Sequence, residues 1–468
     1  MDMNKIILAA VAALSVAGLG ASAEATTTIH AGGSSAARAF INQVPLAICA
    51  QGGATDTVHY ATTNNNNHLW RCTISTDTKV MNYVARGSAD GVTPLTESLG
   101  SLGAKGAVNG RPTLAFLDDT NPIGLNSCPG LTTGIVKTVT GPSGTIFNIT
   151  ISETLGCPVD AGGLPLAPVA YELNLGGSDV LFSSFGQVSP GANEPIPPAG
   201  SLVTDVAMVL PFNVMLAKNL VKLSDGTPVT NMQRKDIESL YAGNTTDWRE
   251  LGIGVTVNGD GTGGIDPAAT QVRLCLRSAG SGSKAAFDKV IMKEGSEVTI
   301  GSPNFSYNSS SSNMRTCLNS STAGTRGRIG YIDANESQAS PAYFGPIQAS
   351  AVTNAYPVKI DGYIAVDSSA LDRANSLKAT HCGKAEFSTN FRFYRRVGGS
   401  YDALTEGLAQ QFVDYAKDPD VIRGIPLAWA YAAPADMLFT RTDDGGVQDS
   451  TFDRAGVGST AICNTLVN

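Results

Sequence analysis

Apolar positions along this chain recur at two spacings, and their alternation predicts strands followed by helices. Short apolar runs with the length and residue types of buried strands occupy residues 26–31, 57–62, 80–87, 205–210 and 272–276. Apolar residues at helical spacing occupy residues 34–51, 233–241, 285–291 and 403–416. Strands that alternate with helices in this way predict an α/β fold.

Residues 91–200 interrupt the alternation, because they are rich in glycine, proline and threonine. Within them, residues 135–139 and 145–151 are β-like segments on either side of Gly141-Pro142-Ser143-Gly144, a sequence typical of turns. We therefore predict a hairpin inside a β-rich insertion.

The rest of the chain adds one more strand-like segment and two loops. An apolar segment at 213–221 follows the strand at 205–210, and residues 356–366 have the pattern of a chain that crosses back. The polar runs 64–67 and 309–312 predict exposed loops.

The first residues have the pattern of a cleaved secretory signal peptide. Lys5 precedes an apolar run over residues 6–20, and Ala21-Ser22-Ala23 is a small-x-small cleavage site. The run is too short and too rich in alanine for a membrane span, and no cysteine near the cut offers a lipid anchor. We expect a mature protein from Glu24 that is periplasmic or secreted and not inserted in a membrane.

Cysteine usage agrees with export. The chain has 8 cysteines, none in a CxxC or Cys/His cluster, so the sequence does not indicate zinc or redox motifs. An even, scattered set in an exported chain most often forms structural disulfides. The sequence does not determine which cysteines pair. We favour pairing between neighbours along the chain, which predicts the bonds Cys49–Cys72, Cys128–Cys157, Cys275–Cys317 and Cys382–Cys463.

Composition and charge narrow the function classes. At 42% hydrophobic residues the chain of 468 residues has enough apolar material for two cores. A net charge of −8 without a basic cluster argues against nucleic acid as a partner. The 4 histidines are scattered, and no nucleophile elbow or pair of carboxylates stands out, so we predict no enzyme activity, cofactor or metal.

Two glycine- and serine-rich turns carry the main chemical signal. One is Ala31-Gly32-Gly33-Ser34-Ser35, and the other is Arg277-Ser278-Ala279-Gly280-Ser281-Gly282-Ser283; each joins an apolar strand to a helical pattern. A helix start presents free N–H groups and the positive end of the helix dipole, which together suit an anion. Arg277 adds a forked, permanent charge. Two such turns far apart in sequence predict two lobes that face one ligand.

With these turns, the chain resembles the periplasmic phosphate-binding protein of the phosphate ABC transporter, which has a type II solute-binding fold. The similar segments are the two turns, Val58-His59-Tyr60, Gly87-Ser88-Ala89-Asp90, the helix and loop between Asn231 and Leu251, and Gly327-Arg328-Ile329-Gly330-Tyr331. They extend over about two-thirds of the mature chain, and residues 91–200 have no counterpart that we can place.

The resemblance implies two lobes with mixed central sheets flanked by helices, joined by hinge crossovers, with the β-rich insertion in lobe one. With the predicted signal peptide at 1–23, it divides the mature chain into lobe one (24–207, including the insertion at about 91–200, and 358–468) and lobe two (208–357). It further implies a monomer that captures inorganic phosphate, or a similar small oxyanion, for an ABC-transporter permease. The phosphate-binding residues that it implies are Gly33, Ser34, Ser35, Asn65, Asp90, Arg277, Ser281, Gly282 and Ser283.

Asp90 has a specific role in this interpretation. Phosphate still carries a proton at neutral pH and sulfate does not, so a buried carboxylate accepts a hydrogen bond from phosphate and repels sulfate. The chain departs from the family by offering Asn64, Asn65 and Asn66 in place of a serine and by the long insertion after Asp90.

Two other functions stay open from the sequence. A structural or surface-interaction protein on the same fold would have an altered or lost site. A secreted enzyme acting on phosphoesters would need a metal cluster or an activated nucleophile, which we do not find in the sequence.

Overall fold

The fold is known from a computed structural model of the chain. The structure describes residues 25–96, 115–117, 125, 127–161, 163–166, 168–187, 202–293, 305–320, 327–334, 352–367, 373–397, 401–425, 431–440, 443–444, 449–450 and 463. The predicted signal peptide lies outside the described residues. No helix among them is long and apolar enough to cross a bilayer.

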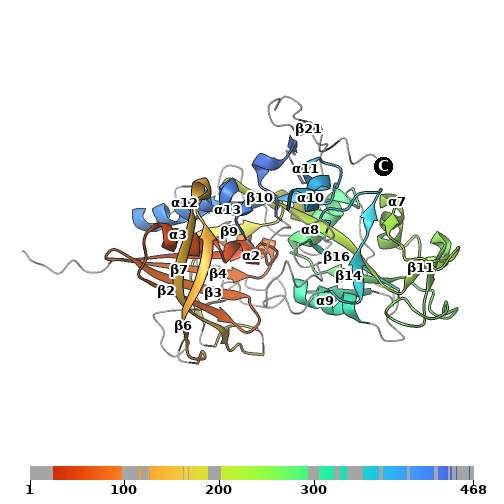
Figure 1. Ribbon diagram of the computed structural model, residues 1–468, viewed down its shortest axis with the longest axis horizontal. Helices are drawn as coiled ribbons and strands as arrows, with labels where there is room; N and C mark the ends of the chain where they lie inside the picture. Colours follow the sequence, from red (N-terminus) through yellow and green to blue (C-terminus); the bar gives the residue numbers. More distant parts are fainter. Residues whose placement is uncertain are drawn as a thin grey trace, which may run out of the picture.

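One large mixed sheet of 13 strands runs through the whole molecule (Figure 1). From edge to edge its strands are β15 (Phe305–Asn308), β14 (Arg273–Arg277), β16 (Arg328–Asp333), β10 (Leu202–Ala217), β19 (Ser388–Arg396), β9 (Leu175–Ser178), β1 (Thr26–Gly33), β4 (Asp77–Ala85), β3 (Asn67–Ile74), β2 (Asp56–Thr62), β7 (Ile146–Cys157) and β6 (Thr132–Thr140), with β17 (Ala355–Pro357) paired to β10. We call the half from β19 to β6 lobe one and the half with β14, β15 and β16 lobe two.

Further short strands and the α-helices surround this sheet. The strands pair as β11 (Leu220–Lys222) with β13 (Ile253–Val255), β12 (Asn231–Met232) with β18 (Lys359–Ile360), β5 (Ala115–Phe116) with β8 (Val169–Ala170), and β20 (Phe439–Thr440) with β21 (Asp449–Ser450). The helices are α2 (Arg38–Ile41), α3 (Val44–Gln51), α4 (Ser88–Val92), α7 (Arg234–Tyr241), α8 (Gly282–Val290), α9 (Ser311–Asn319), α10 (Arg373–Ser376), α11 (Lys378–His381), α12 (Ala403–Lys417) and α13 (Pro419–Arg423).

Strand β10 connects the two lobes. Its first part pairs antiparallel with β19 from Leu202 to Pro211, and its second part pairs antiparallel with β16 from Phe212 to Leu216. The sequence pattern predicted two separate segments here, and this was wrong, because Pro211 and its neighbours continue one strand. A single backbone ladder therefore runs through the junction of the lobes.

Lobe one is built around β1, which pairs parallel with β4 on one side and with β9 on the other. Helix α12 packs on β1, and α3 packs on α12 and on strands β3, β6 and β7. The predicted helix over residues 34–51 is in fact two helices, α2 and α3, and Pro45 lies in the first turn of α3. Along α12, Leu408, Phe412 and Tyr415 are buried as the spacing predicts, but Leu404 is exposed.

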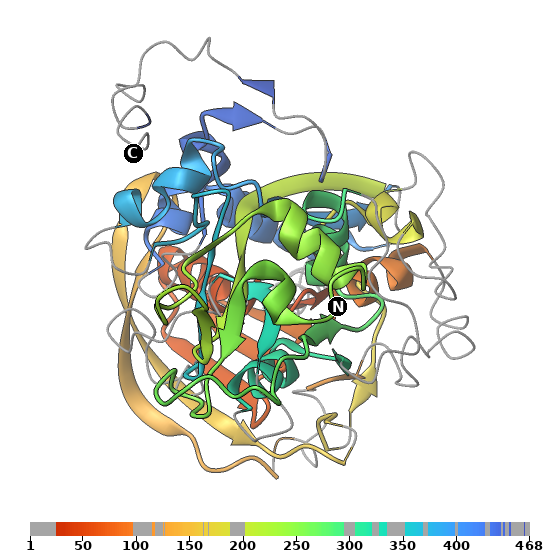
Figure 2. The ribbon, with the colours of Figure 1, turned by 90° about the vertical axis from the view of Figure 1, so that its right-hand side faces the viewer.

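The insertion contributes to lobe one in two ways. Its predicted hairpin is confirmed as β6 and β7, and β7 pairs parallel with β2 at the edge of the sheet. Figure 2, which looks along the long axis, shows this hairpin curving around the outside of the molecule. The insertion also supplies β9, a strand in the middle of the sheet. The insertion is therefore an integral part of the sheet of lobe one.

Lobe two places β14 between β15 and β16, parallel to both. Helices α8 and α9 pack on these strands. Aromatic rings fill the core between α8, β16 and the junction. The ring of Phe287 stacks on that of Tyr331 with centroids 4.1 Å apart, and the ring centroid of Tyr241 lies 4.5 Å from that of Phe287. Strand β14 ends at Arg277, and α8 begins shortly after it at Gly282.

Disulfide bonds join the four predicted pairs: Cys49–Cys72, Cys128–Cys157, Cys275–Cys317 and Cys382–Cys463. The first two lie in lobe one. The third ties β14 to α9 in lobe two. Nearest-neighbour pairing is confirmed for all four bonds.

Candidate functional site

The first turn follows β1 in lobe one. Gly33 has φ of 138°, and a Cβ there would lie 2.0 Å from the carbonyl oxygen of Gly177, so only glycine fits. This close approach lets the Ser34 N–H donate to the Gly177 carbonyl at 3.0 Å. Ser34 and Ser35 are then buried rather than exposed at a surface turn.

Two tyrosines fix the carbonyl groups of this turn. The Tyr83 hydroxyl donates to the Ser34 carbonyl at 2.7 Å, and the Tyr431 hydroxyl donates to the Ala36 carbonyl at 2.8 Å. The Ser34 hydroxyl oxygen accepts from the Ala36 N–H at 3.0 Å. The hydrogen bonds of this turn thus fix both its carbonyl groups and the Ser34 side chain.

The second turn leads into α8 in lobe two. The Ser281 side chain caps the helix and accepts from the Lys284 N–H at 3.4 Å. Gly282 and Ser283 begin the helix, and no acceptor among the described residues forms a hydrogen bond with their backbone N–H groups. The helix start therefore offers donors together with the positive end of its dipole.

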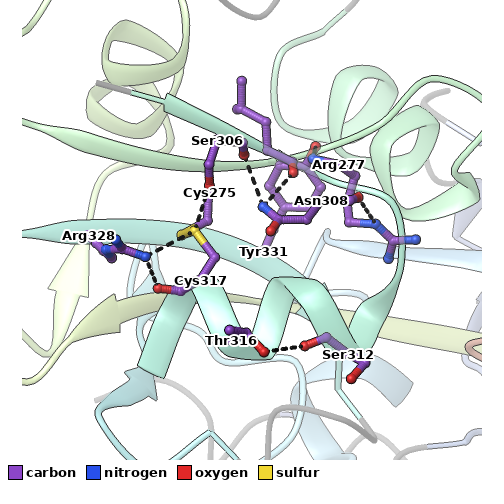
Figure 3. The surroundings of a disulfide bond; sticks show 10 residues. Cys275, Arg277, Ser306, Asn308, Ser312, Thr316, Cys317, Arg328 and Tyr331 are labelled. Atoms are coloured by element: carbon purple, nitrogen blue, oxygen red, sulfur yellow. Dashed lines mark hydrogen bonds between the residues drawn. A yellow bond between two sulfur atoms is a disulfide. The ribbon is translucent and has the colours of Figure 1, made fainter. Parts of the chain in front are cut away.

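Arg277 lies at the end of β14, with 2% of its surface exposed. Its Nε donates to the Asn308 carbonyl at 3.2 Å and its Nη1 donates to Ser311 Oγ at 3.2 Å. Its backbone N–H donates to the Tyr331 hydroxyl, and Asn308 in turn donates to the Leu276 carbonyl (Figure 3). Burial lowers the pKa of Arg277, yet an arginine keeps its charge. The guanidinium is thus held in one orientation.

Contacts across the junction bring the two turns together. The Ala89 N–H at the start of α4 donates to the Gly280 carbonyl at 3.2 Å. A Cβ on Gly282 would lie 2.2 Å from Ser88 Oγ. From the first turn, Ser35 Oγ lies 3.5 Å from Ser311 Oγ, the same hydroxyl that Arg277 contacts.

Of the residues singled out from the sequence, most meet at this junction. Gly33, Ser34 and Ser35 approach it from lobe one, and Arg277, Ser281, Gly282 and Ser283 approach it from lobe two. Asp90 lies on the short helix α4, two residues after Ser88.

Asn65 is placed differently. It lies in the turn between β2 and β3 with φ of 55°, and its carbonyl oxygen is 3.3 Å from His68 Nε2. Among the described residues, its side chain makes no hydrogen bond to either glycine turn. The structure does not bring it to the site.

Ser311 was missed because the run 309–312 predicted an exposed loop, and this was wrong. Ser310 caps α9, and Ser311 is fully buried against Arg277. A run of serines before a helical pattern is a helix-start signal that could have indicated this.

Two buried carboxylates were also missed. Asp179, which follows β9, has 3% of its surface exposed, and burial raises its pKa to about 6. Asp333, at the end of β16, is fully buried, and its pKa is raised to about 7 by burial and then by Asp179. Only the fold brings these aspartates near the turns, and a single aspartate in sequence gives no signal.

Arginines from both lobes oppose this increase. Arg38 on α2, Arg277 on β14 and Arg315 on α9 each lower the pKa of Asp333. The junction therefore combines fixed positive charge, hydroxyl groups, free N–H groups and carboxyl groups. The donors and positive charges of such a set can bind a small oxyanion, and the carboxyl groups can distinguish an anion that carries a proton from one that does not. The described residues contain no cluster of three or more metal-ligating side chains.

Comparisons with known proteins were made for the whole chain. Residues 194–419 match the model of the PBP superfamily domain. Among solved structures, the chain is similar to one from Clostridium perfringens, named as a phosphate ABC transporter substrate-binding protein with bound phosphate, at 12% identity and a TM-score of 0.42, covering 86% of this chain and 98% of that one. It is also similar to an ABC-type phosphate transport receptor from Vibrio cholerae, at 13% identity and a TM-score of 0.39, covering 87% and 100%. No curated protein matches the chain.

Proposed function

Because residues 194–419 match the model of the PBP superfamily domain, we propose that the chain is a solute-binding protein that captures inorganic phosphate between its two lobes. The proposal includes export, delivery to an ABC-transporter permease, and lobe boundaries at 24–207, 208–357 and 358–468. It is a binding function and involves no chemical step.

The meeting of the two glycine turns is the observation that carries the proposal. The start of α8 supplies the N–H groups of Gly282 and Ser283, and the first turn supplies the hydroxyls of Ser34 and Ser35. Arg277 supplies charge in a fixed orientation. A tetrahedral oxyanion can accept from all three groups at once, which gives both affinity and orientation.

Selectivity for phosphate over sulfate follows from the carboxyl groups in the proposal. Asp90 would accept from the proton that phosphate keeps at neutral pH. Sulfate has no such proton and would place its charge against the carboxylate. Asp90→Asn should therefore weaken the discrimination between the two anions.

Thermal unfolding with added anion tests the proposal. A ligand present at about 100 times its dissociation constant stabilises the folded state by about 2.7 kcal/mol. We expect millimolar phosphate to raise the melting temperature and sulfate to leave it unchanged. Absence of any phosphate effect on protein freed of bound ligand would overturn the proposal.

A further inference from the structure

A segment near the C-terminus runs along the junction of the lobes. This C-terminal segment comprises residues 431–440 and 443–444, which follow the residues 194–419 matched by the PBP superfamily domain. The Ala432 N–H donates to the Val209 carbonyl of β10 at 3.0 Å, and the Val209 N–H donates to the Ala432 carbonyl at 2.8 Å. Val209 lies in the part of β10 that pairs with β19, just before the strand continues into lobe two. The C-terminal segment is therefore attached to the strand that connects the lobes.

Further contacts fix the path of this segment. At its start, the Tyr431 hydroxyl donates to the Ala36 carbonyl of the first glycine turn at 2.8 Å. Farther along, the Leu438 N–H donates to the His381 carbonyl at 3.0 Å, and the next residue after His381 belongs to the disulfide Cys382–Cys463. The C-terminal segment is thus held to the first turn at its start and, beyond its end, by a covalent bond.

Asp444 forms the buried contact of this segment with lobe one. Asp444 has 2% of its surface exposed, and Arg392 on β19 has 4% exposed. Oδ1 of Asp444 accepts from Nη1 of Arg392 at 3.0 Å. Oδ2 accepts from the Ser184 hydroxyl at 2.8 Å and from the Leu181 N–H. A buried charge is tolerated when it is paired and hydrogen-bonded, and Asp444 is both.

The two donors to Oδ2 belong to a loop that follows β9 and reaches lobe two. Leu181 directly precedes the 3₁₀ helix η4 (Phe182–Gln187), and Ser184 lies within it. Helix η4 packs against α4 and against α8, the helix that begins in the second glycine turn. The rings of Phe182 and Phe185 on η4 are buried. Asp444 therefore fixes a loop that contacts the anion-binding helix of the opposite lobe.

A contact of this kind affects the release of a ligand more than its arrival. A ligand enclosed between two lobes leaves only when the lobes separate, so contacts that exist only in the closed form lower the dissociation rate. Entry of the ligand into an open cleft does not depend on them. A displaced η4 would weaken the contact with α8 and leave the groups that bind the anion unaltered.

We propose that Asp444 is a positioning residue of the anion site, whose carboxylate holds η4 against α8 and thereby keeps the lobes closed on the bound anion. It acts through η4 and does not contact the ligand. The inference rests on the proposed function, since it concerns the release of phosphate, and it gives the C-terminal segment a part in that function.

Release of radiolabelled phosphate tests this inference. The full-length mature protein would be loaded with labelled phosphate and mixed with excess unlabelled phosphate, and rapid filtration gives the dissociation rate; equilibrium dialysis then gives the affinity and hence the association rate. We expect Asp444→Asn to release phosphate about tenfold faster at an unchanged association rate, because an amide does not pair with Arg392 as a carboxylate does. Ser184→Ala, which removes one bond and keeps the ion pair, should accelerate release about threefold.

A control variant separates positioning from stability. Glu153→Gln, on β7, removes a carboxylate that is paired with Lys137 and His59 in lobe one. Urea unfolding should show a loss of stability for Glu153→Gln, whereas its rate of phosphate release should equal that of the unaltered protein. Faster release by Glu153→Gln in proportion to its lost stability would overturn the role of Asp444, because release would then follow stability alone.

The remaining outcomes distinguish the inference from the proposed function. Unchanged release by both Asp444→Asn and Ser184→Ala would overturn the role of Asp444 while phosphate binding stands. If Asp444→Asn does not fold, unchanged release by Ser184→Ala overturns it equally. Absence of phosphate binding by the unaltered protein would overturn the proposed function itself.

Discussion

At the scale of single residues, Arg277 connects the two lobes through the hydroxyl of Ser311. That hydroxyl receives the Arg277 Nη1 hydrogen bond and lies 3.5 Å from Ser35 Oγ of the opposite lobe. Many arginines carry the same charge, but this guanidinium is held in one direction by its hydrogen bonds to Asn308 and Ser311. Hydrogen bonds that involve a charged group contribute about 1.5–3 kcal/mol each, so the orientation has a measurable value.

We therefore expect Arg277→Lys to weaken phosphate binding about 10- to 100-fold although the charge is kept. Lysine presents a point charge and does not donate to Asn308 and Ser311 as a fork. Titration calorimetry measures the change. Arg249→Lys, at an exposed arginine paired with Asp247, is the matched control and should leave the affinity unaltered. Equal affinities for the two variants would contradict the role of Arg277.

Gly282 lies where the two lobes approach each other closely. A methyl group there would lie 2.2 Å from Ser88 Oγ and 2.8 Å from Asp179 Cβ, so Gly282→Ala should hold the turns apart. We expect at least a tenfold loss of phosphate affinity with the fold retained. Gly264→Ala is the matched control, because a Cβ there meets no atom within 4 Å. Normal binding by Gly282→Ala would show that the turns do not close on the ligand.

Residue types near a turn could be predicted from the sequence, but their distant partners could not. Gly33 and Gly282 are recognisable because glycine and serine between a strand and a helix have few structural alternatives. Asp179 lies 89 residues after Asp90 in a segment without helical or strand periodicity strong enough to place it. Only the pairing of β9 with β1 brings it to the first turn.

At the scale of elements, the disulfide Cys275–Cys317 ties the strand that ends in Arg277 to the helix that begins with Ser311 (Figure 3). Arg328 adds a contact, since its Nη1 donates to the Cys317 carbonyl. Arg277 and Ser311, which form a hydrogen bond, therefore lie on two elements that a covalent bond joins. Alternation of strand and helix predicted β14 and α8, but the burial of α9 depends on this tertiary link.

Replacing both cysteines of this pair by alanine should therefore have two effects. Loss of a native disulfide destabilises a protein by about 2–5 kcal/mol, which urea unfolding would show. Phosphate affinity should fall as well, because α9 no longer fixes Arg277. Alanines at Cys128 and Cys157, near the end of β7, should reduce stability without changing affinity. If both double variants bind phosphate equally well, the disulfide has no part in positioning the site.

At the scale of the whole molecule, one continuous sheet means that the lobes are not independent folding units. Strand β10 belongs to both, and β9 comes from the insertion but lies in the middle of lobe one. Removing residues 103–187 would therefore delete a central strand and Asp179 together. The architecture could be predicted from the alternation of strands and helices, whereas the continuity across Pro211 could not, because proline usually ends a strand.

The insertion also covers a buried histidine pair. His59 Nε2 lies 3.2 Å from His68 Nδ1, and His59 Nδ1 lies 3.4 Å from Glu153 Oε2 of β7. The hydrogen bond with His59 lowers the pKa of Glu153 to about 2. Burial lowers the pKa of His59, and burial together with His59 and Arg38 places the pKa of His68 well below its usual value. Both histidines are therefore neutral in the folded protein at neutral pH.

This pair makes stability depend on pH in a defined direction. Below pH of about 6.5 the unfolded chain binds protons that folded His68 does not, so folding stability falls as the pH falls, by up to about 1.4 kcal/mol per pH unit. Denaturant unfolding between pH 7.5 and 5 should show a smaller loss for His68→Asn than for the unaltered protein. Asp179 and Asp333 contribute equally to both proteins, so the difference isolates the histidine. Parallel pH profiles would contradict a neutral buried His68.

Equilibrium dialysis with radiolabelled phosphate tests the central claim most directly. The protein would be unfolded, dialysed free of bound anion and refolded with its disulfides intact, and phosphate binding would then be measured with and without excess sulfate. The account predicts one phosphate bound per chain, undiminished by sulfate, and much weaker binding to Arg277→Lys. No saturable binding up to millimolar phosphate, or complete displacement by sulfate, would contradict it.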